Sequence, residues 1–145
     1  GLDAIWSSKQ AGLKSVKLIT RKPPQGLDQA DYFKTHPFPK LTGYQEVCIF
    51  RGSARVAGKN FPQNINVAAV LSIAGLGATK TQVEIWTSKK YNSNQHEVKV
   101  FSGAGEIMSV TRNVPSKQNP KTSALAVYSA IASLKNIFSR IRIGA

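Results

Sequence analysis

The chain has 145 residues, enough for one ordinary domain that buries its own core, and a formal net charge of +13 at pH 7. Its 20 basic residues are scattered, without aromatic interleaving or a solid basic helix face, so the charge pattern argues against a nucleic-acid partner. No apolar run approaches the roughly 20 residues that cross a membrane, which argues against a membrane partner.

The single cysteine and the first residues bear on where the protein works. Cys48 lies in an apolar run typical of a strand, which predicts a buried thiol in a reducing compartment, and we therefore expect a cytoplasmic protein. The first residues show neither the basic segment nor the cleavage site of a secretory signal. They open without a methionine, inside a segment typical of a helix already under way, so we expect a piece of a longer polypeptide whose preceding domain is absent.

The alternation of apolar and polar residues predicts a sheet packed against helices. Gly12 closes the first helix, Pro23 and Pro24 end the first strand, and the later strands alternate. Such strands have one dry face, so we expect a two-layer α+β domain with a mostly antiparallel mixed sheet, covered on one face by helices. The predicted elements are helix 2–13, strand 16–20, an irregular loop over 25–44, strand 46–50, short helix 53–57 with Ser53 as N-cap, central helix 66–75, an antiparallel meander of strands 82–86, 97–101 and 106–110, a second well-buried helix over 119–134 and a short final strand over 140–144.

The central helix is predicted from the longest run of small and apolar residues, which lies within residues 61–77. It has almost no polar face, so we expect it to be covered on most sides. Polar residues gather at its start, where free backbone N–H groups and the positive end of the helix dipole can hold an anion or a polar ligand. Two readings stay open on this pattern: Asn64 and Asn66 act as caps, or they help to bind a ligand.

The residues that could perform chemistry are few. His36 precedes Pro37 in the irregular loop, where we expect a solvated or structural role. His96 lies where a turn meets a strand, so that its imidazole can point over the end of the sheet, although a lone histidine of this kind can also be structural. One cysteine, two distant histidines and seven carboxylates give no coordinating spacing, so we expect no metal site. No P-loop, GxGxxG or GxSxG motif is present.

A second polar cluster enters the last helix. Lys121, Thr122 and Ser123, together with nearby backbone N–H groups, would suit a small carboxylate. A capped helix start with an exposed lysine explains the same residues, so both interpretations stay open.

Seven motifs occur in a fixed order and together cover essentially the whole chain. They are GLDAI at 1–5, TRKPP at 20–24, FRGSAR at 50–55, FPQNINVAA at 61–69, AGLG at 74–77, NQHEV at 94–98 and NPKTSALAVYSA at 119–130. With them the chain resembles the C-terminal domain of the L-aspartate dehydrogenase family. Its departures from the family pattern are Arg51, where an acidic residue is frequent, and Trp86, in a strand that often ends in an Ala-Asp-Pro turn.

The resemblance implies a two-domain oxidoreductase. Residues 1–145 would be its catalytic and substrate domain, preceded by an NAD(P)-binding Rossmann domain that is absent from this chain, with NAD or NADP between the two. Family enzymes interconvert aspartate and oxaloacetate plus ammonia through iminoaspartate, and can serve NAD biosynthesis. The active-site histidine of the family falls on His96, whose imidazole can exchange protons near neutral pH, and its cofactor-contacting asparagine falls on Asn66.

The remaining expectations concern substrate and partners. For the dicarboxylate substrate the candidates are Lys121, Thr122 and Ser123, together with Lys22. We expect a homodimer through the outer face of the sheet, and an isolated fragment that is inactive on its own. The alternative is a non-catalytic relative that acts as an anion-binding or interaction module.

Overall fold

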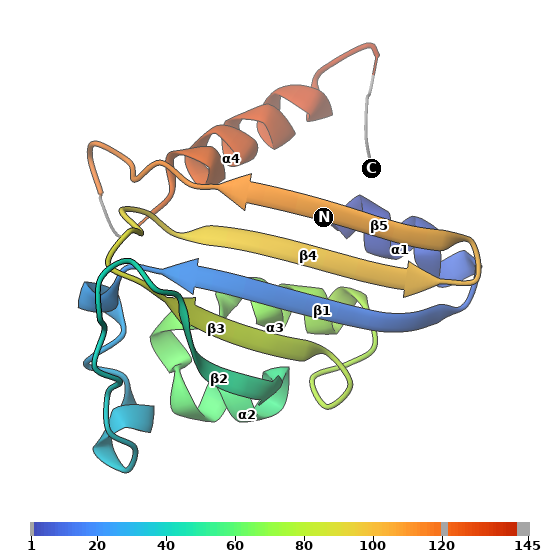
Figure 1. The fold of residues 1–145 in the computed structure, drawn as a ribbon. Helices are drawn as coiled ribbons and strands as arrows, with labels where there is room; N and C mark the ends of the chain where they lie inside the picture. Colours follow the sequence, from blue (N-terminus) through green and yellow to red (C-terminus); the bar gives the residue numbers. More distant parts are fainter. Residues whose placement is uncertain (1, 120–121, 142–145) are drawn as a thin grey trace.

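A five-stranded mixed sheet in the order β2-β3-β1-β4-β5 organises the computed structural model, which describes residues 2–119 and 122–141 (Figure 1). The central strand β1 pairs in parallel with β3 and antiparallel with β4, and β2 and β5 add antiparallel strands at the two edges. The strands are β1 (Leu13–Lys22), β2 (Val47–Ser53), β3 (Gln82–Thr87), β4 (Gln95–Ser102) and β5 (Gly105–Arg112).

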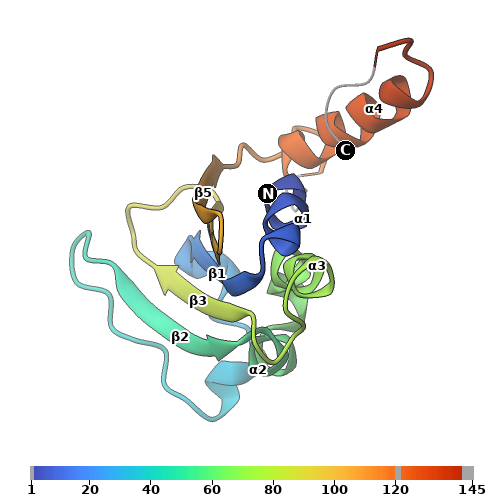
Figure 2. The same cartoon turned by 90° about the vertical axis from the view of Figure 1, so that its right-hand side faces the viewer.

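Three helices cover one face of this sheet and the other face stays open (Figure 2). The covering helices are α1 (Leu2–Gln10), α2 (Ala54–Asn60) and α3 (Asn66–Ala74). Gly12 ends the turn after α1 with a φ of 75°, a conformation that glycine adopts without strain. The predicted two-layer α+β fold, mostly antiparallel and covered on one face by helices, is confirmed.

The core lies between the sheet and these helices. Phe61 is fully buried there, with its ring centroid 5.4 Å from that of Phe50 and 5.1 Å from that of Tyr32. Tyr32 belongs to a short 3-10 helix, η2 (Asp31–Lys34), so the predicted irregular loop contributes to the core. Two further 3-10 helices are η1 (Pro24–Gly26) and η3 (Pro62–Asn64).

The predicted meander of three consecutive strands is wrong. β1 lies between β3 and β4, so only β4 and β5 form an antiparallel hairpin. Local alternation indicates that a segment is a strand but carries no information about which distant strand it pairs with. The parallel pairing of β1 with β3 depends on contacts between segments more than 60 residues apart.

The predicted burial of the last helix is also wrong. α4 (Ala124–Ile137) contains no buried residue, and it extends from the end of β5 away from the sheet (Figure 2). Leu125, Tyr128 and Leu134 are 51%, 68% and 61% exposed. An apolar stripe of this kind is typical of a helix that packs on another element. Among the described residues, no element buries the stripe of α4.

The central helix α3 is covered on one side only. Ala68, Leu71 and Ser72 are buried, whereas Val70 and Ile73 are 46% and 84% exposed. Its small and apolar composition therefore overstated its burial, because such a run also suits a helix that offers a second face to another surface.

The capping predictions have mixed outcomes. Ser53 is the N-cap of α2 and accepts a hydrogen bond from Val56 N–H at 3.4 Å, as expected. Asn64 is not the N-cap of α3, contrary to the prediction: Ile65 holds that position, and its apolar side chain makes no capping hydrogen bond. Of the predicted final strand, residues 140 and 141 are not strand, and residues 142–144 lie outside the described part. No helix in the described ranges is long and apolar enough to cross a membrane.

Candidate functional site

One end of the sheet gathers polar side chains around His96. β1 ends there at Lys22 and the antiparallel β4 begins there, so that Thr20 and His96 are directly opposed across the two strands. Leu18 and Val98, which form another opposed pair in the same register, lie in the core beneath the helices. Because side chains alternate along a strand, Thr20, Lys22 and His96 belong to the same helix-covered face.

A hydrogen bond between Thr20 and His96 forms the centre of this site. The Thr20 Oγ1 atom lies 2.5 Å from His96 Nδ1. Thr20 is buried, with 2% of its surface exposed, and His96 is half-buried. Within the described residues no other hydrogen bond reaches the imidazole, so Nε2 is the ring nitrogen without a protein partner.

Lys22 adds a buried cation beside the histidine. Only 8% of its surface is exposed, and this burial lowers the pKa of its ammonium group to about 8. A buried positive charge is stabilised when an anion comes close to it. Lys22 is therefore chemically suited to a carboxylate ligand, the role that the sequence suggested for it.

Burial, with a smaller contribution from the charge of Lys22, lowers the pKa of His96 to about 4. Its imidazole is therefore neutral near pH 7. The sequence alone suggested an ordinary imidazole that exchanges protons near neutral pH. The fold changes that expectation, because a neutral imidazole acts first as a hydrogen-bonding group and becomes protonated only when the surrounding charge changes.

Asn66 lies at the start of α3 with an exposed side chain. The far end of this helix packs on the start of β1, where a Cβ added to Gly75 would lie 3.2 Å from Val16 Cγ2. The helix therefore runs along the sheet with Asn66 toward the end that carries His96 (Figure 1). No hydrogen bond of the described residues joins Asn66 to His96, although both lie toward one end of the sheet.

The segment before α4 lies at this end as well. Asn113 N–H donates to Asn94 O at 2.9 Å, directly after β5 and before β4, and Ser116 N–H donates to Thr122 O at 2.8 Å. These backbone bonds place Thr122 beyond the end of β5, toward the end of the sheet that carries His96.

The roles of the three residues predicted here differ. Ser123 is the N-cap of α4, and its hydroxyl accepts a hydrogen bond from Ala126 N–H at 3.1 Å. The capping interpretation of Ser123 is therefore observed, and a hydroxyl that accepts from a backbone N–H can still donate to a ligand. Thr122 is half-buried beside it. Lys121 lies outside the described residues.

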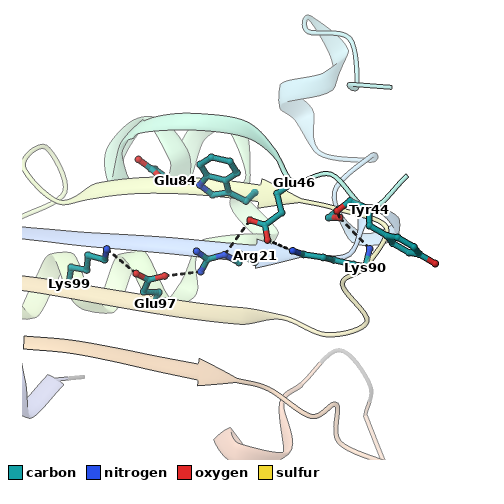
Figure 3. A network of polar contacts seen from close by, with 9 residues as sticks. Arg21, Tyr44, Glu46, Glu84, Lys90, Glu97 and Lys99 are labelled. Carbon is teal, nitrogen blue, oxygen red and sulfur yellow. Dashed lines mark hydrogen bonds and ion pairs between the residues drawn. The ribbon is translucent and has the colours of Figure 1, made fainter. Parts of the chain in front are cut away.

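The open face of the same strands carries a network of ion pairs instead (Figure 3). Arg21 Nη1 lies 2.9 Å from Glu97 Oε2, and Lys99 Nζ lies 3.0 Å from the other oxygen of that carboxylate. Lys90 Nζ pairs with Glu46 Oε1 at 2.5 Å, and Arg21 Nε reaches the same carboxylate at 4.0 Å. Arg21 therefore links the loop before β2 to β4.

A hollow of about 420 Å³ opens on this face and does not include His96. Two of its three cationic groups, Arg21 and Lys90, are paired with its own carboxylates, which leaves little positive charge for a dicarboxylate. The site around the half-buried His96 is thus the stronger candidate. The hollow is lined by Arg21, Glu46, Lys90, Tyr91, Gln95, Glu97, Val110 and Arg112.

Sequence reasoning missed Thr20, Arg21 and Glu97. All three lie inside the quoted motifs TRKPP and NQHEV, and alternation places Thr20 on one face and Arg21 on the other. The missing information was the register that opposes Thr20 to His96. A register between strands this distant in sequence is set by the tertiary fold.

The other residues that could take part in catalysis, His36 and Cys48, make contacts that suit a structural role. The ring of His36 stacks on Tyr32 at a centroid distance of 4.0 Å, as a structural role predicts. The Cys48 thiol is half-buried and donates to Phe50 O at 3.3 Å, and burial raises its pKa, which makes it a poor nucleophile. Within residues 2–119 and 122–141, no group of three or more His, Cys, Asp or Glu side chains could hold a metal ion.

Fold and site together define an α+β domain with a half-buried, uncharged histidine at one end of a mixed sheet, next to a buried lysine. The family model described as "Aspartate dehydrogenase, C-terminal" matches residues 3–137. The chain therefore belongs to the family of aspartate dehydrogenase C-terminal domains, as the seven motifs indicated.

Individual relatives agree with this assignment. The chain is 42% identical over 144 residues to an L-aspartate dehydrogenase of Methanosarcina mazei, and 36% identical over 145 residues to L-aspartate dehydrogenase 3 of Bordetella bronchiseptica. Each comparison covers 99% of this chain and 53% of the relative. The crystal structure of aspartate dehydrogenase from Thermotoga maritima matches with a TM-score of 0.76 and 32% identity, over 99% of this chain and 52% of that one. The chain thus spans about half the length of the relatives it matches.

Proposed function

We propose that this chain is the substrate and catalytic domain of an NAD(P)-dependent L-aspartate dehydrogenase. The reaction converts aspartate to iminoaspartate, and then to oxaloacetate plus ammonia, and it could supply NAD biosynthesis. The observation that carries the proposal is His96, which lies at one end of the sheet with no hydrogen bond to Nε2 from the described residues, in a chain that belongs to this family. Family membership names the reaction class, and the site offers residues that suit it.

The residues at the start of α3 suit a dinucleotide. The exposed Asn66 side chain makes no hydrogen bond within the described residues, and the first-turn N–H groups of α3 are free to bind polar groups. We assign Asn66 as the residue of this chain that contacts NAD or NADP, which a Rossmann domain outside this chain would hold. When bound, the nicotinamide accepts a hydride from the α-carbon of aspartate.

His96 would act on the nitrogen and oxygen of the substrate. A neutral imidazole with Nε2–H can donate a hydrogen bond to the developing hydroxyl of a carbinolamine, and the anionic substrate raises its capacity to take up a proton. Burial of the site strengthens such a hydrogen bond, because the local dielectric is lower than in water.

The dicarboxylate requires cations and hydrogen-bond donors. Lys22 supplies a buried ammonium beside His96, and Thr122 and Ser123 supply hydroxyls at the same end of the sheet. Lys121 completes the proposed set from the sequence. In the complete enzyme we expect Lys121→Ala to raise the KM for oxaloacetate, and an unchanged KM would remove Lys121 from the set.

The proposal also covers the cellular compartment and the oligomeric state. We propose a cytoplasmic homodimer that buries the open face of the sheet. Support comes from Phe101, Met108 and Val110, which are 45%, 54% and 49% exposed on that face, an apolar exposure that another protein surface would cover.

The test uses the complete protein that carries this chain. NAD(P)H oxidation is measured with oxaloacetate and ammonium for wild type, His96→Asn and the matched control His36→Asn. We expect His96→Asn to lower kcat by about 100-fold or more, because it removes the proposed proton donor. His36→Asn should leave kcat unchanged, because the exposed His36 side chain contacts only its own loop, where it stacks on Tyr32 and hydrogen-bonds Thr35 and Tyr32 O.

Each outcome separates the two functional readings. A wild-type protein that turns over these substrates, together with a nearly normal His96→Asn variant, would refute the catalytic assignment of His96. A folded wild-type protein without turnover with either cofactor would favour the non-catalytic module, which the net charge of +13 would suit as an anion binder.

A further inference from the structure

We propose that Thr20 is a positioning residue for His96: its hydroxyl donates a hydrogen bond to Nδ1 and so holds the imidazole in the tautomer with the proton on Nε2. This inference deepens the proposed function, because it assigns the atom through which His96 would meet the substrate. It concerns the ring itself, however, so it can be tested without turnover.

The direction of the Thr20–His96 hydrogen bond follows from the need of the Thr20 hydroxyl hydrogen for an acceptor. Thr20 is 2% exposed, so its hydroxyl hydrogen cannot be given to bulk water. Among the described residues, His96 Nδ1, at 2.5 Å, is the one partner of that hydroxyl. If Nδ1–H donated instead, the hydroxyl hydrogen would be buried without an acceptor, which is unfavourable. Donation from Thr20 to an unprotonated Nδ1 satisfies both groups and leaves the proton on Nε2.

The backbone on both sides holds this pair in place. Thr20 lies on the central strand β1, which is hydrogen-bonded to β3 on one side and to β4 on the other. A β-branched side chain in a strand has few accessible rotamers, so the hydroxyl loses little freedom when it binds the ring.

An ion pair on the opposite face reinforces the same register. Arg21 follows Thr20 on β1 and Glu97 follows His96 on β4, and their side chains meet at 2.9 Å across the pair. Sliding β4 along β1 would break this ion pair together with the Thr20–His96 hydrogen bond. The two interactions therefore support one alignment of the strands.

Thr111 provides a matched control on the other side of the histidine. It is the residue of β5 directly opposed to His96, as Thr20 is on β1. No hydrogen bond joins its side chain to His96 within the described part of the chain. A Thr→Val change at either position removes one hydroxyl beside the same ring and keeps the β-branched shape.

The experiment measures the tautomer and the kinetics in the complete protein. The side chains of histidine are labelled with ¹⁵N, and the NMR shifts of Nδ1 and Nε2 of His96 are recorded near pH 7 in wild type, Thr20→Val, Thr20→Ser and Thr111→Val. His96→Asn identifies the signal. Steady-state rates with oxaloacetate, ammonium and NAD(P)H are measured for the same proteins.

We expect the wild-type ring to show a protonated Nε2 and an unprotonated Nδ1. Thr20→Val should mix the two tautomers and lower kcat by about 10-fold, the value of one hydrogen bond, with a smaller effect on KM. Thr20→Ser should restore both the tautomer and most of the rate, and Thr111→Val should match wild type.

Two outcomes would overturn the inference. One is a wild-type ring protonated on Nδ1, a result that needs no folded variant. The other is a Thr20→Val protein that folds and keeps the wild-type tautomer. If the tautomer responds as expected but the wild-type protein has no turnover, the positioning role stands and the proposed dehydrogenase function fails. If wild type has normal turnover but Thr20→Val leaves the tautomer unchanged, the dehydrogenase function stands and the positioning role of Thr20 fails.

Discussion

The two faces of the sheet use the same strands for different electrostatics. On the helix-covered face, Lys22 and His96 are withdrawn from water, and burial lowers both of their pKa values. On the open face, burial alone would raise the pKa of Glu84, but hydrogen bonds from Lys17 and Trp86 lower it below its usual range. The two faces of one sheet thus give charged groups opposite electrostatic surroundings.

This difference assigns separate tasks to the faces. A buried cation favours an anionic ligand, because the charge of the ligand offsets part of the cost of burial. A carboxylate that already has two or three donors is satisfied and contributes to alignment of the strands. The helix-covered face therefore suits binding and chemistry, and the open face suits the register that holds the site.

The largest effect is expected in the core beneath the helix-covered face. Phe61→Ala removes a fully buried ring that contacts Phe50 and Tyr32, and should lower the free energy of unfolding by about 3–5 kcal/mol. Denaturant unfolding measures this change. Tyr44→Ala, at a side chain that is 76% exposed, is the control and should change stability by less than about 0.5 kcal/mol. Equal effects of the two changes would contradict the described core.

The second effect is a loss of stability in acid that depends on His96. The unfolded imidazole binds its proton near pH 6.5, whereas the folded one has a pKa of about 4. Between these values the unfolded chain binds more protons, so stability is full above about pH 6.5 and falls as the pH drops toward 4.

Denaturant unfolding at a series of pH values compares wild type with His96→Asn. The stability of wild type should fall by about 2–3 kcal/mol more than that of the variant over this window, since the variant lacks the titrating ring. Parallel pH curves for the two proteins would show that His96 is not held neutral by the fold.

A smaller effect is expected on the open face. Glu84 is 5% exposed and holds Lys17 at 2.8 Å, Arg51 at 2.9 Å and the Trp86 ring N–H at 3.0 Å. Glu84→Gln keeps the shape but removes the charge. We expect a loss of about 1–2 kcal/mol, moderate because Lys17 and Arg51 can turn to water.

Glu106→Gln is the control, at an exposed carboxylate of β5 that forms no ion pair within the described residues. It should be nearly neutral, and added salt should reduce the difference between the two variants. An effect of Glu84→Gln as large as that of Phe61→Ala would remove the distinction between the faces.

Much of the fold was predictable because its signals are local. Alternation identified every strand within a few residues, Gly12 and Ser53 marked helix boundaries as expected, and Asn66 was correctly placed at the start of a helix. The position of β1 between β3 and β4 was not predictable, because pairing of distant strands depends on packing that no local pattern contains.

The candidate site was likewise predictable only in part. His96 could be selected from the sequence because only two histidines occur and one of them follows a turn at the start of a strand. Its Thr20 partner and its lowered pKa could not, since both arise from strand register and burial. The exposure of α4 was mispredicted because an apolar stripe shows that a helix needs a partner, but not whether that partner is in the same chain.

By itself the sequence determined the family, the strands and helices and the residue types available for chemistry, since motifs and local periodicity are properties of the chain. The tertiary structure alone decided that Thr20 opposes His96, that Lys22 is buried beside it and that Arg21 and Glu97 meet on the other face. The physical reason is that protonation states and hydrogen-bond directions depend on which groups exclude water from one another, and only the packed fold sets those distances.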